Sequence, residues 1–258
     1  MGKQEPAENT DAAKKKGTNH NAIIALILIL VGLGVLLYPV VATQWNNHTQ
    51  SRAAEEYAKL EKQAPPEVLH TAWEEAQAYN AGLGQISIGD AWTTTDNEDS
   101  PEYQRYRQYL SVLSETDAMG RIVIPSIDSD LPIYHGTSEK ALSRGAGHLY
   151  GTDLPVGGVG DGEGRHAALS AHTGLQNATL WDNLTKVKKG DAFYIAAGGE
   201  KLKYEVHDIR VVEPADTSLL HREPGQDLVT LITCTPYGVN THRLLVAGHR
   251  VPMEIGRA

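Results

Sequence analysis

The sequence contains little sulfur. Its 258 residues include a single cysteine, Cys234. No disulfide can form within the chain, and there are too few sulfurs for a structural zinc site. In an extracytoplasmic domain an unpaired cysteine is either a buried, inert residue or a reactive thiol, and free cysteine is among the most buried residue types. The surroundings of Cys234 therefore have to decide between a structural and a catalytic role.

Positive charge is also scarce. The chain has 23 Lys and Arg against 32 Asp and Glu, which gives a formal net charge of −9 at pH 7. Non-specific binding of nucleic acid requires a surface that neutralises phosphates. We therefore expect no nucleic-acid partner.

Long hydrophobic runs are limited to one. Residues 22–41 are twenty residues without a charge, enough to cross a hydrocarbon core of about 30 Å at about 1.5 Å per residue. Lys14 to Lys16 precede the run, and Glu55 and Glu56 follow it, so the positive-inside bias predicts a cytoplasmic N-terminus. A cleaved signal peptide is the alternative, but its apolar region usually spans only about 7–15 residues. We interpret the run as a retained membrane anchor in contact with lipid, with the chain after Thr43 outside the cell.

Composition divides the chain into five parts. These are a cytoplasmic tail (1–21), a transmembrane anchor (22–43), a helical segment (44–84), a loop (85–100) and a β-rich domain (101–258). The helical segment contains an Ala-, Glu- and Lys-rich stretch from Ser51 to Gln63, which Pro65 and Pro66 end, and an amphipathic stretch from Leu69 to Leu83. The loop has no periodicity and is longer than about 12–15 residues, which is typical of lids and linkers.

The chain after Gly120 predicts strands. Seven short runs rich in β-branched and apolar residues are separated by Gly, Pro, Asp and Asn. The runs are Arg121 to Ile124, Leu131 to Tyr134, His166 to Ala171, Ala192 to Ala196, Lys203 to Val212, Leu228 to Cys234 and Arg243 to Val251. Because strands and helices do not alternate regularly, we expect the sheet to close into a barrel or a sandwich.

Three residues at predicted strand ends suggest acyl-transfer chemistry. Cys234 ends its strand beside Thr-Pro-Tyr-Gly, and His172 follows its strand in the same way. A thiol has an ordinary pKa of about 8.5, and a neighbouring imidazolium lowers it. Arg243 opens the strand after a short loop, so a hairpin would bring it within about 5 Å of Cys234, where it can stabilise an oxyanion. On local grounds alone, each residue also has an ordinary alternative: a buried thiol, a surface or core histidine, a surface arginine.

Three separated stretches resemble one known family. The run TLITCTPYGVNTHRLLVAGHR (Thr230 to Arg250) resembles the active-site signature of sortases, and LSAHTGL (Leu169 to Leu175) resembles their histidine motif. The residues of both motifs resemble those of class C, the pilin-polymerising sortases, most, and so does the stretch from Gly120 to Gly158. The likeness extends from about Tyr57 to Arg250, and three motifs in the right order are far more specific than one.

The resemblance implies both a fold and a set of roles. The fold is mostly β: a sortase-type closed β-barrel with short helices, preceded by an N-terminal transmembrane helix and a helical, lid-bearing segment. Cys234 matches the nucleophile that attacks the Thr–Gly bond of an LPxTG-like sorting signal and forms a thioester. His172 matches the acid and base that serves the leaving and incoming amines, and Arg243 matches the residue that positions substrate and stabilises the oxyanion. The sequence identifies no third residue that orients His172.

The loop before the barrel resembles the class C lid. Its Asp-Pro-aromatic motif matches Asp90, Ala91 and Trp92, which implies that Asp90 pairs with Arg243 and that Trp92 covers the Cys234 sulfur. The departure is Ala91 in place of proline, which should loosen the lid by about 0.4–1 kcal/mol through a freer open chain. An incidental Asp and Trp in a surface loop is the alternative.

The function implied is covalent joining of surface proteins on a Gram-positive-type cell. The partners are LPxTG-bearing surface proteins or pilins, and the acceptor is a pilin lysine or, alternatively, a peptidoglycan amine. Class C also implies a second transmembrane segment after the barrel, and none precedes Ala258. Two other possibilities are a cysteine protease that hydrolyses and a non-catalytic, membrane-tethered binding module with a buried thiol. No metal or organic cofactor is implied.

Overall fold

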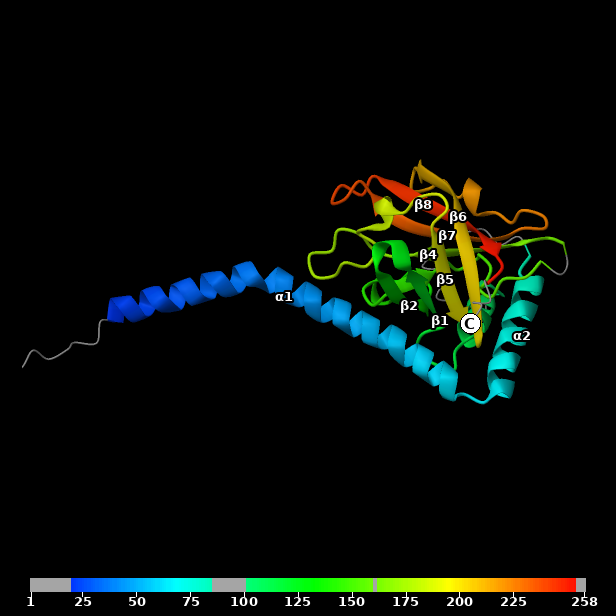
Figure 1. Ribbon diagram of the computed structural model, residues 1–258, viewed down its shortest axis with the longest axis horizontal. Coiled ribbons are helices and arrows are strands. Elements are labelled where there is room, and N and C mark those ends of the chain that lie inside the picture. The colour runs from blue at the N-terminus through cyan, green and yellow to red at the C-terminus, as the bar shows by residue number, and fades with distance from the viewer. Residues whose placement is uncertain (1–19, 85–100, 160–161, 254–258) are drawn as a thin grey trace, which may run out of the picture. The chain divides into compact units, whose positions relative to one another are not determined.

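Eight strands form a closed barrel in the computed structural model, which describes residues 20–84, 101–159 and 162–253 (Figure 1). Around the barrel the strands follow the order β1-β2-β3-β4-β7-β8-β6-β5. Their bounds are β1 Gly120–Ile124, β2 Ser129–His135, β3 Ala146–His148, β4 Arg165–Ser170, β5 Ala192–Ala197, β6 Glu200–Val212, β7 Asp227–Thr235 and β8 His242–Val251. The mostly β fold and the closed barrel are therefore confirmed.

Two of the strand pairs are parallel, β2 with β3 and β4 with β7, and the other pairs are antiparallel. Four helices are described, together with short 3₁₀ turns. The helices are α1 His20–Gln63, α2 Pro66–Gly82, α3 Pro101–Ser111 and α4 Glu139–Leu142, and the turns are η2 Pro125–Ile127, η3 Leu184–Lys186 and η4 Ser218–Leu220. The sequence predicted neither α3 nor β3.

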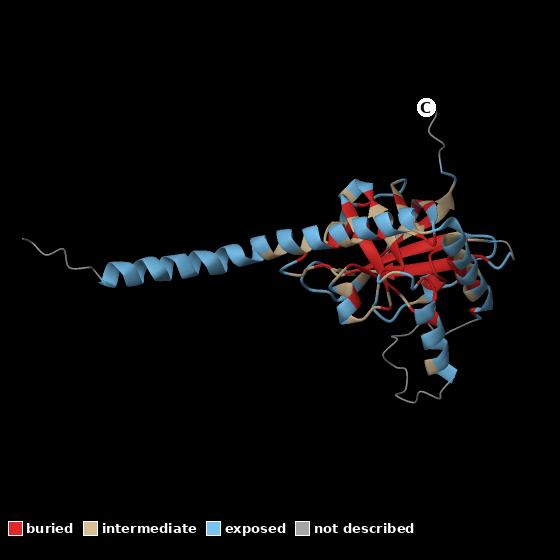
Figure 2. Cartoon of the chain, turned by 90° about the horizontal axis from the view of Figure 1, so that it is seen from below, coloured by how far each residue is buried: buried red, intermediate tan, exposed pale blue. Residues whose placement is uncertain are grey.

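The barrel encloses the main core, in which inward and outward residues alternate along each strand. On β5 the buried positions are Phe193, Ile195 and Ala197, the period of two that a strand with one face in a core requires. Phe193 stacks on Tyr204 with ring centroids 5.4 Å apart. A Cβ on Gly248 would lie 2.5 Å from the Phe193 ring. A glycine at this position therefore leaves the space that the ring occupies. Figure 2 shows the buried residues concentrated in the strands.

Strand β7 is buried on both faces, which explains its almost unbroken apolar run. Val229 and Leu231 belong to the barrel core. Ile232 faces the other way and belongs to a second apolar cluster with Ala168 of β4 and Leu245 of β8. Leu220 of η4 completes that cluster. The three neighbouring strands β4, β7 and β8 are therefore held together on both sides.

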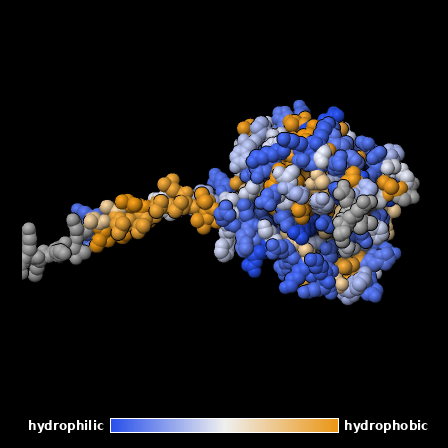
Figure 3. All heavy atoms as spheres, in the orientation of Figure 1, coloured by the Kyte–Doolittle hydropathy of each residue, from blue (hydrophilic) through white to orange (hydrophobic). Residues whose placement is uncertain are grey.

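The chain divides into two compact units, Met1–Val40 and Val41–Ala258. In the first unit, the apolar turns of α1 are exposed and have the length and composition to cross a membrane. Figure 3 shows apolar side chains along these turns, whereas hydrophilic side chains dominate the visible face of the barrel. In the second unit α1 continues without interruption to Gln63. The sequence predicted the anchor and the stretch from Ser51 as separate elements, and they form one helix.

Helices α2 and α3 attach to the barrel through buried polar groups. On α2, Ala72, Ala76 and Asn80 are buried at a spacing of four residues. The Asn80 side-chain amide donates to the Leu154 carbonyl (3.0 Å) and its oxygen accepts the Leu154 N–H (2.7 Å). On α3, the fully buried Tyr109 hydroxyl lies 3.0 Å from His148 Nδ1. These contacts satisfy polar groups that would otherwise be costly to bury.

Acid should destabilise the fold through buried His148. Its Nε2 faces the Asp153 carbonyl oxygen at 2.7 Å, so Nε2 carries the proton of the neutral ring and Nδ1 accepts from Tyr109. Burial lowers the pKa of His148 from 6.5 to about 4. The unfolded chain therefore binds this proton more readily, and stability that is complete above about pH 6.5 falls as the pH drops toward 4, by about 3 kcal/mol for this group.

Urea unfolding at pH 7.5 and pH 4.5 measures this loss. The pKa values of His135 and His166 are lowered by burial as well, and they add to the loss with the same sign. His148→Gln cannot titrate and should reduce the difference between the two pH values. An equal difference in the variant would show that His148 is not a source of the acid sensitivity.

Candidate functional site

The three predicted catalytic residues come from adjacent strands. Cys234 is the penultimate residue of β7 and pairs directly with Arg243, the second residue of β8. In an antiparallel pair, side chains directly opposite share a face and have Cβ atoms about 4.5–5.5 Å apart. Ile232 and Leu245 form the neighbouring pair on the same face and belong to the outer apolar cluster. Cys234 and Arg243 therefore lie on the outer face of the barrel and not in its core.

His172 is brought to the same end by β4, the parallel neighbour of β7. Ser170 pairs with Ile232, and the Ala171 N–H donates to the Ile232 carbonyl at 3.1 Å. The Thr233 hydroxyl donates to the Ala171 carbonyl at 2.8 Å, so the two chains stay in register past the end of β4. Ala171 is buried in the barrel core. Since side chains alternate, the register directs His172 to the face that carries Cys234.

The loop after His172 is fastened at several points. The carboxylate of Asp182 accepts the Gly174 N–H (2.7 Å) and the Thr173 hydroxyl (3.0 Å). The Trp181 N–H donates to the His172 carbonyl at 3.1 Å, and the Trp181 side chain is fully buried. We call residues 172–182 the histidine loop. Its backbone is set by Asp182 and Trp181, and the sequence motif did not point to either residue.

The β7–β8 loop carries the groups beside Cys234. It starts with a cis peptide bond between Thr235 and Pro236, and the Pro236 carbonyl accepts two backbone N–H groups at 3.0 Å. A Cβ built on Gly174 would lie 3.4 Å from the Gly238 nitrogen, so the histidine loop and this loop are in contact. Arg243 Nη1 donates to the Asn240 carbonyl at 3.3 Å and to its neighbour's carbonyl at 3.1 Å. The guanidinium is therefore held near the strand end.

Two of the three predicted catalytic side chains are partly exposed. Cys234 is partly exposed, so the buried thiol that the binding-module alternative requires is not found. The His172 side chain is 25% exposed, and its Nε2 lies 3.4 Å from a carboxylate oxygen of Glu139 on α4. This is an ion-pair distance without hydrogen-bond geometry, and among the described residues Nε2 has no hydrogen-bond partner. Glu139 is an exposed acidic neighbour of His172 that the sequence did not identify.

A second histidine of β4 has a structural role. His166, on β4, is 3% exposed. Its Nε2 lies 2.8 Å from the Thr230 hydroxyl and its Nδ1 lies 2.8 Å from the His221 carbonyl. Burial lowers the pKa of His166, which keeps the ring neutral. A histidine that is buried and satisfied in this way differs from His172 at the strand end.

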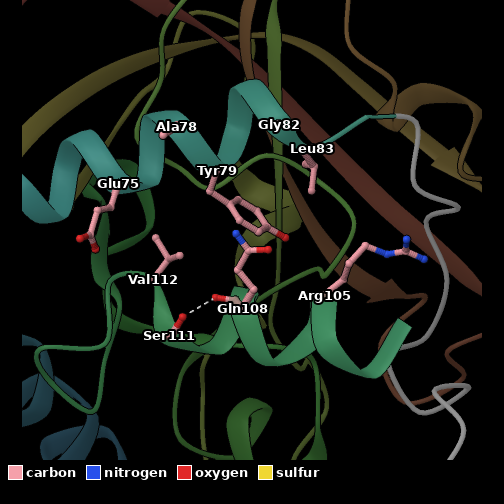
Figure 4. Close-up of a pocket in the computed structure, with 9 residues that line it drawn as sticks. All are labelled: Glu75, Ala78, Tyr79, Gly82, Leu83, Arg105, Gln108, Ser111 and Val112. Atoms are coloured by element: carbon pink, nitrogen blue, oxygen red, sulfur yellow. Dashed lines mark hydrogen bonds between the residues drawn. The ribbon is translucent and has the colours of Figure 1, made fainter. Parts of the chain in front are cut away.

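The hollow shown in Figure 4 lies away from these residues. It has a volume of about 420 Å³ between α2 and α3, and Tyr79, Arg105 and Gln108 are among its lining residues. None of the three predicted catalytic residues lines it. Within residues 20–84, 101–159 and 162–253, no group of three or more His, Cys, Asp or Glu side chains is placed to hold a metal ion. The predicted lid residues Asp90 and Trp92 lie outside the described residues.

Comparison with known proteins identifies the family. The family model of the sortase domain matches residues 122–251. Sortase A of Bacillus anthracis is 30% identical over 139 residues, which are 54% of this chain and 62% of that protein. The chain thus spans less than two thirds of this curated relative.

Solved structures extend the likeness beyond the barrel. Sortase C-1 from Actinomyces oris is 51% identical, with a TM-score of 0.66, over 72% of this chain and 99% of that one. Sortase C of Streptococcus pneumoniae is 40% identical, with a TM-score of 0.66, over 78% of this chain and 97% of that one. The chain belongs to the sortase family, whose members are cysteine transpeptidases.

Proposed function

We propose that this chain is a membrane-anchored transpeptidase that cleaves an LPxTG-like sorting signal between Thr and Gly. One observation carries the proposal. Cys234 and Arg243 are directly opposite each other in the register of β7 and β8, and β4 brings His172 to the same end and face. A nucleophile, an acid–base group and a cationic donor form the minimal set for acyl transfer. The exposed apolar turns of α1 support the anchor.

The reaction assigns one role to each side chain. The thiolate of Cys234 attacks the Thr carbonyl carbon, and Arg243 stabilises the oxyanion that forms. As the C–N bond breaks, His172 protonates the departing glycine amine, which leaves a thioester on Cys234. His172 then removes a proton from an incoming amine, the new amide bond forms and the thiolate is released. Transfer to an amine in place of water distinguishes this enzyme from a cysteine protease.

We propose a pilin lysine as the acceptor, which makes the product an isopeptide bond in a pilus. The support is the 40–51% identity to sortase C structures, of which the pneumococcal one bears on pilin substrate specificity. The proposed orientation puts the N-terminus in the cytoplasm and the barrel at the surface of a Gram-positive-type cell. A peptidoglycan amine remains the second acceptor to test.

Incubation of the full chain in detergent with an LPxTG peptide should produce a covalent adduct. The intact mass is expected to rise by that of the acyl fragment ending at Thr. Cys234→Ala should show no adduct, because the thioester has no sulfur. Parallel samples carrying Asp90→Ala and Trp92→Ala remove the proposed lid and should acylate faster.

The same assay identifies the acceptor amine. Adding a lysine-bearing pilin peptide or a cross-bridge amine should discharge the adduct to a product whose mass identifies the amine. Release of free acid alone would indicate a protease. An adduct that persists in Cys234→Ala, or no adduct even with both lid residues replaced, would overturn the proposed chemistry for this signal.

A further inference from the structure

The part of α1 that follows its apolar turns contacts the histidine loop directly. Asn47 is bonded twice to Thr179: its Nδ2 donates to the Thr179 hydroxyl at 2.8 Å, and its Oδ1 accepts the Thr179 N–H at 3.0 Å. Asn46 Nδ2 donates to the Asn177 carbonyl at 2.7 Å, and the Thr43 hydroxyl donates to the Gln176 carbonyl at 3.3 Å. We call Thr43, Asn46 and Asn47 the α1 clamp.

The clamp lies on one face of the helix. Residues three and four apart are neighbours on a helix, and this face continues through Gln50 to Ala54 and Tyr57, which are buried. The adjacent His48 points away and is exposed. The face is polar at residues 43–50 because it meets backbone carbonyls and an amide of a loop, whereas it turns apolar farther along the helix.

Hydrogen bonds, and not apolar packing, hold this junction. A cavity of about 280 Å³ lies beside it, lined mainly by polar residues that include Asn47, Gln50 and Thr179. Buried Ala178 and Trp181 fix the far part of the histidine loop in the core. The clamp holds residues 176–179, which include Ala178 and lie between Trp181 and His172. Loss of its bonds would leave that part attached to the barrel through buried Ala178, and through the bonds of Asp182 to Thr173 and Gly174 nearer His172.

We propose that the α1 clamp positions the histidine loop, so that the helix leaving the membrane sets the place of the imidazole at the reaction centre. The clamp residues touch no reacting atom and act through the loop. This inference rests on the proposed function, because the role of His172 does. A displacement of about 1 Å at a reacting group can lower a rate by about 10², so a modest shift of the loop has a measurable effect.

Three substitutions that each add one negative charge test the clamp in the full chain in detergent. Asn46→Asp replaces the donor to the Asn177 carbonyl by an acceptor, and should lower the rate of peptide acylation at saturating peptide about tenfold. Asn47→Asp keeps two acceptors for the N–H and hydroxyl of Thr179, and should stay within about twofold of the parent chain. His48→Asp, on the exposed side, should also stay within about twofold. Asn47→Ala, which loses both bonds, should resemble Asn46→Asp.

The readouts separate positioning from general stability. In Asn46→Asp and Asn47→Ala, the peptide concentration that gives half the maximal rate should be unchanged while the maximal rate falls. Amide hydrogen exchange should be faster in residues 173–179 and unchanged elsewhere. Parental rates and exchange in both Asn46→Asp and Asn47→Ala would overturn the proposal, and so would faster exchange throughout the barrel. If the parent chain forms no adduct, the proposed function fails separately, and the exchange measurement still decides whether the clamp holds the loop.

Discussion

Replacing His172 by Ala is expected to lower the rate of thioester formation by about 10²–10⁴-fold. This is the usual contribution of a positioned acid–base group, and here the glycine amine would have to leave without a proton. The thiol of Cys234 and its pairing with Arg243 remain in place. Adduct formation followed by intact mass, at saturating peptide, measures the effect.

The matched control is His70→Ala. His70 lies on α2, where its ring is exposed and faces Glu74 at 3.3 Å, so its removal should leave the rate unchanged. His172→Ala should also retain the parental Tm because the ring is partly exposed and its Nε2 has no hydrogen-bond partner in the part of the chain that the structure describes. A rate within about threefold of the parent would show that another group transfers the proton.

Replacing Asp153 by Ala is expected to destabilise the fold by about 3–5 kcal/mol, the range for removing one partner of a buried ion pair. The carboxylate is 1% exposed and binds Arg222 through two bonds of 2.5 and 2.8 Å. It also accepts the His166 N–H at 2.8 Å and faces the buried Arg165 at 3.9 Å. Arg222 in turn donates to the Asn80 carbonyl at 2.6 Å, so the loss extends to α2.

Asp208→Ala is the control for this prediction. Asp208 also faces two cations, Lys189 at 3.0 Å and Arg210 at 2.8 Å, but at the surface. Such exposed pairs contribute only about 0–1 kcal/mol. Urea unfolding of the full chain, followed through tryptophan fluorescence to which buried Trp181 contributes, compares the two variants. Equal midpoints for Asp153→Ala and Asp208→Ala would contradict a stabilising role for the buried pair.

Much of the barrel was predictable because its longest strands have a local signal. The runs that became β7 and β8 are rich in β-branched and aliphatic residues, and the short loop between them implied the antiparallel pairing of Cys234 with Arg243 that the structure shows. Strand β3 has no such signal. It consists of Ala, Gly and His, and a Cβ on Gly147 would lie 2.3 Å from the Gly136 carbonyl. The close backbone contact requires small residues there, and such a short run of small residues is typical of a loop when only the sequence is considered.

The surroundings of the site were less predictable than its three central residues. Glu139 is 33 residues before His172 and meets it through α4, and Asn47 is 132 residues before Thr179. Contacts of this kind depend on the tertiary arrangement, and no motif marks them. The same holds for α1: the residues from Gln44 to Gln50 have modest helix propensity, and their bonds to the histidine loop support a helix that local preference did not predict.

Closure of the barrel restricts how an extended peptide can be recognised. Each of the eight described strands has a neighbour on both sides, although the last residues of β6, Val206 to Val212, pair with β8 alone. Where a strand is paired on both sides, it has no free row of backbone donors and acceptors for the strand addition that domains with an open sheet edge use. Under the proposed function, a sorting signal is read mainly by side chains and loops at the end of the barrel. Closure also protects the paired strands from edge-to-edge aggregation.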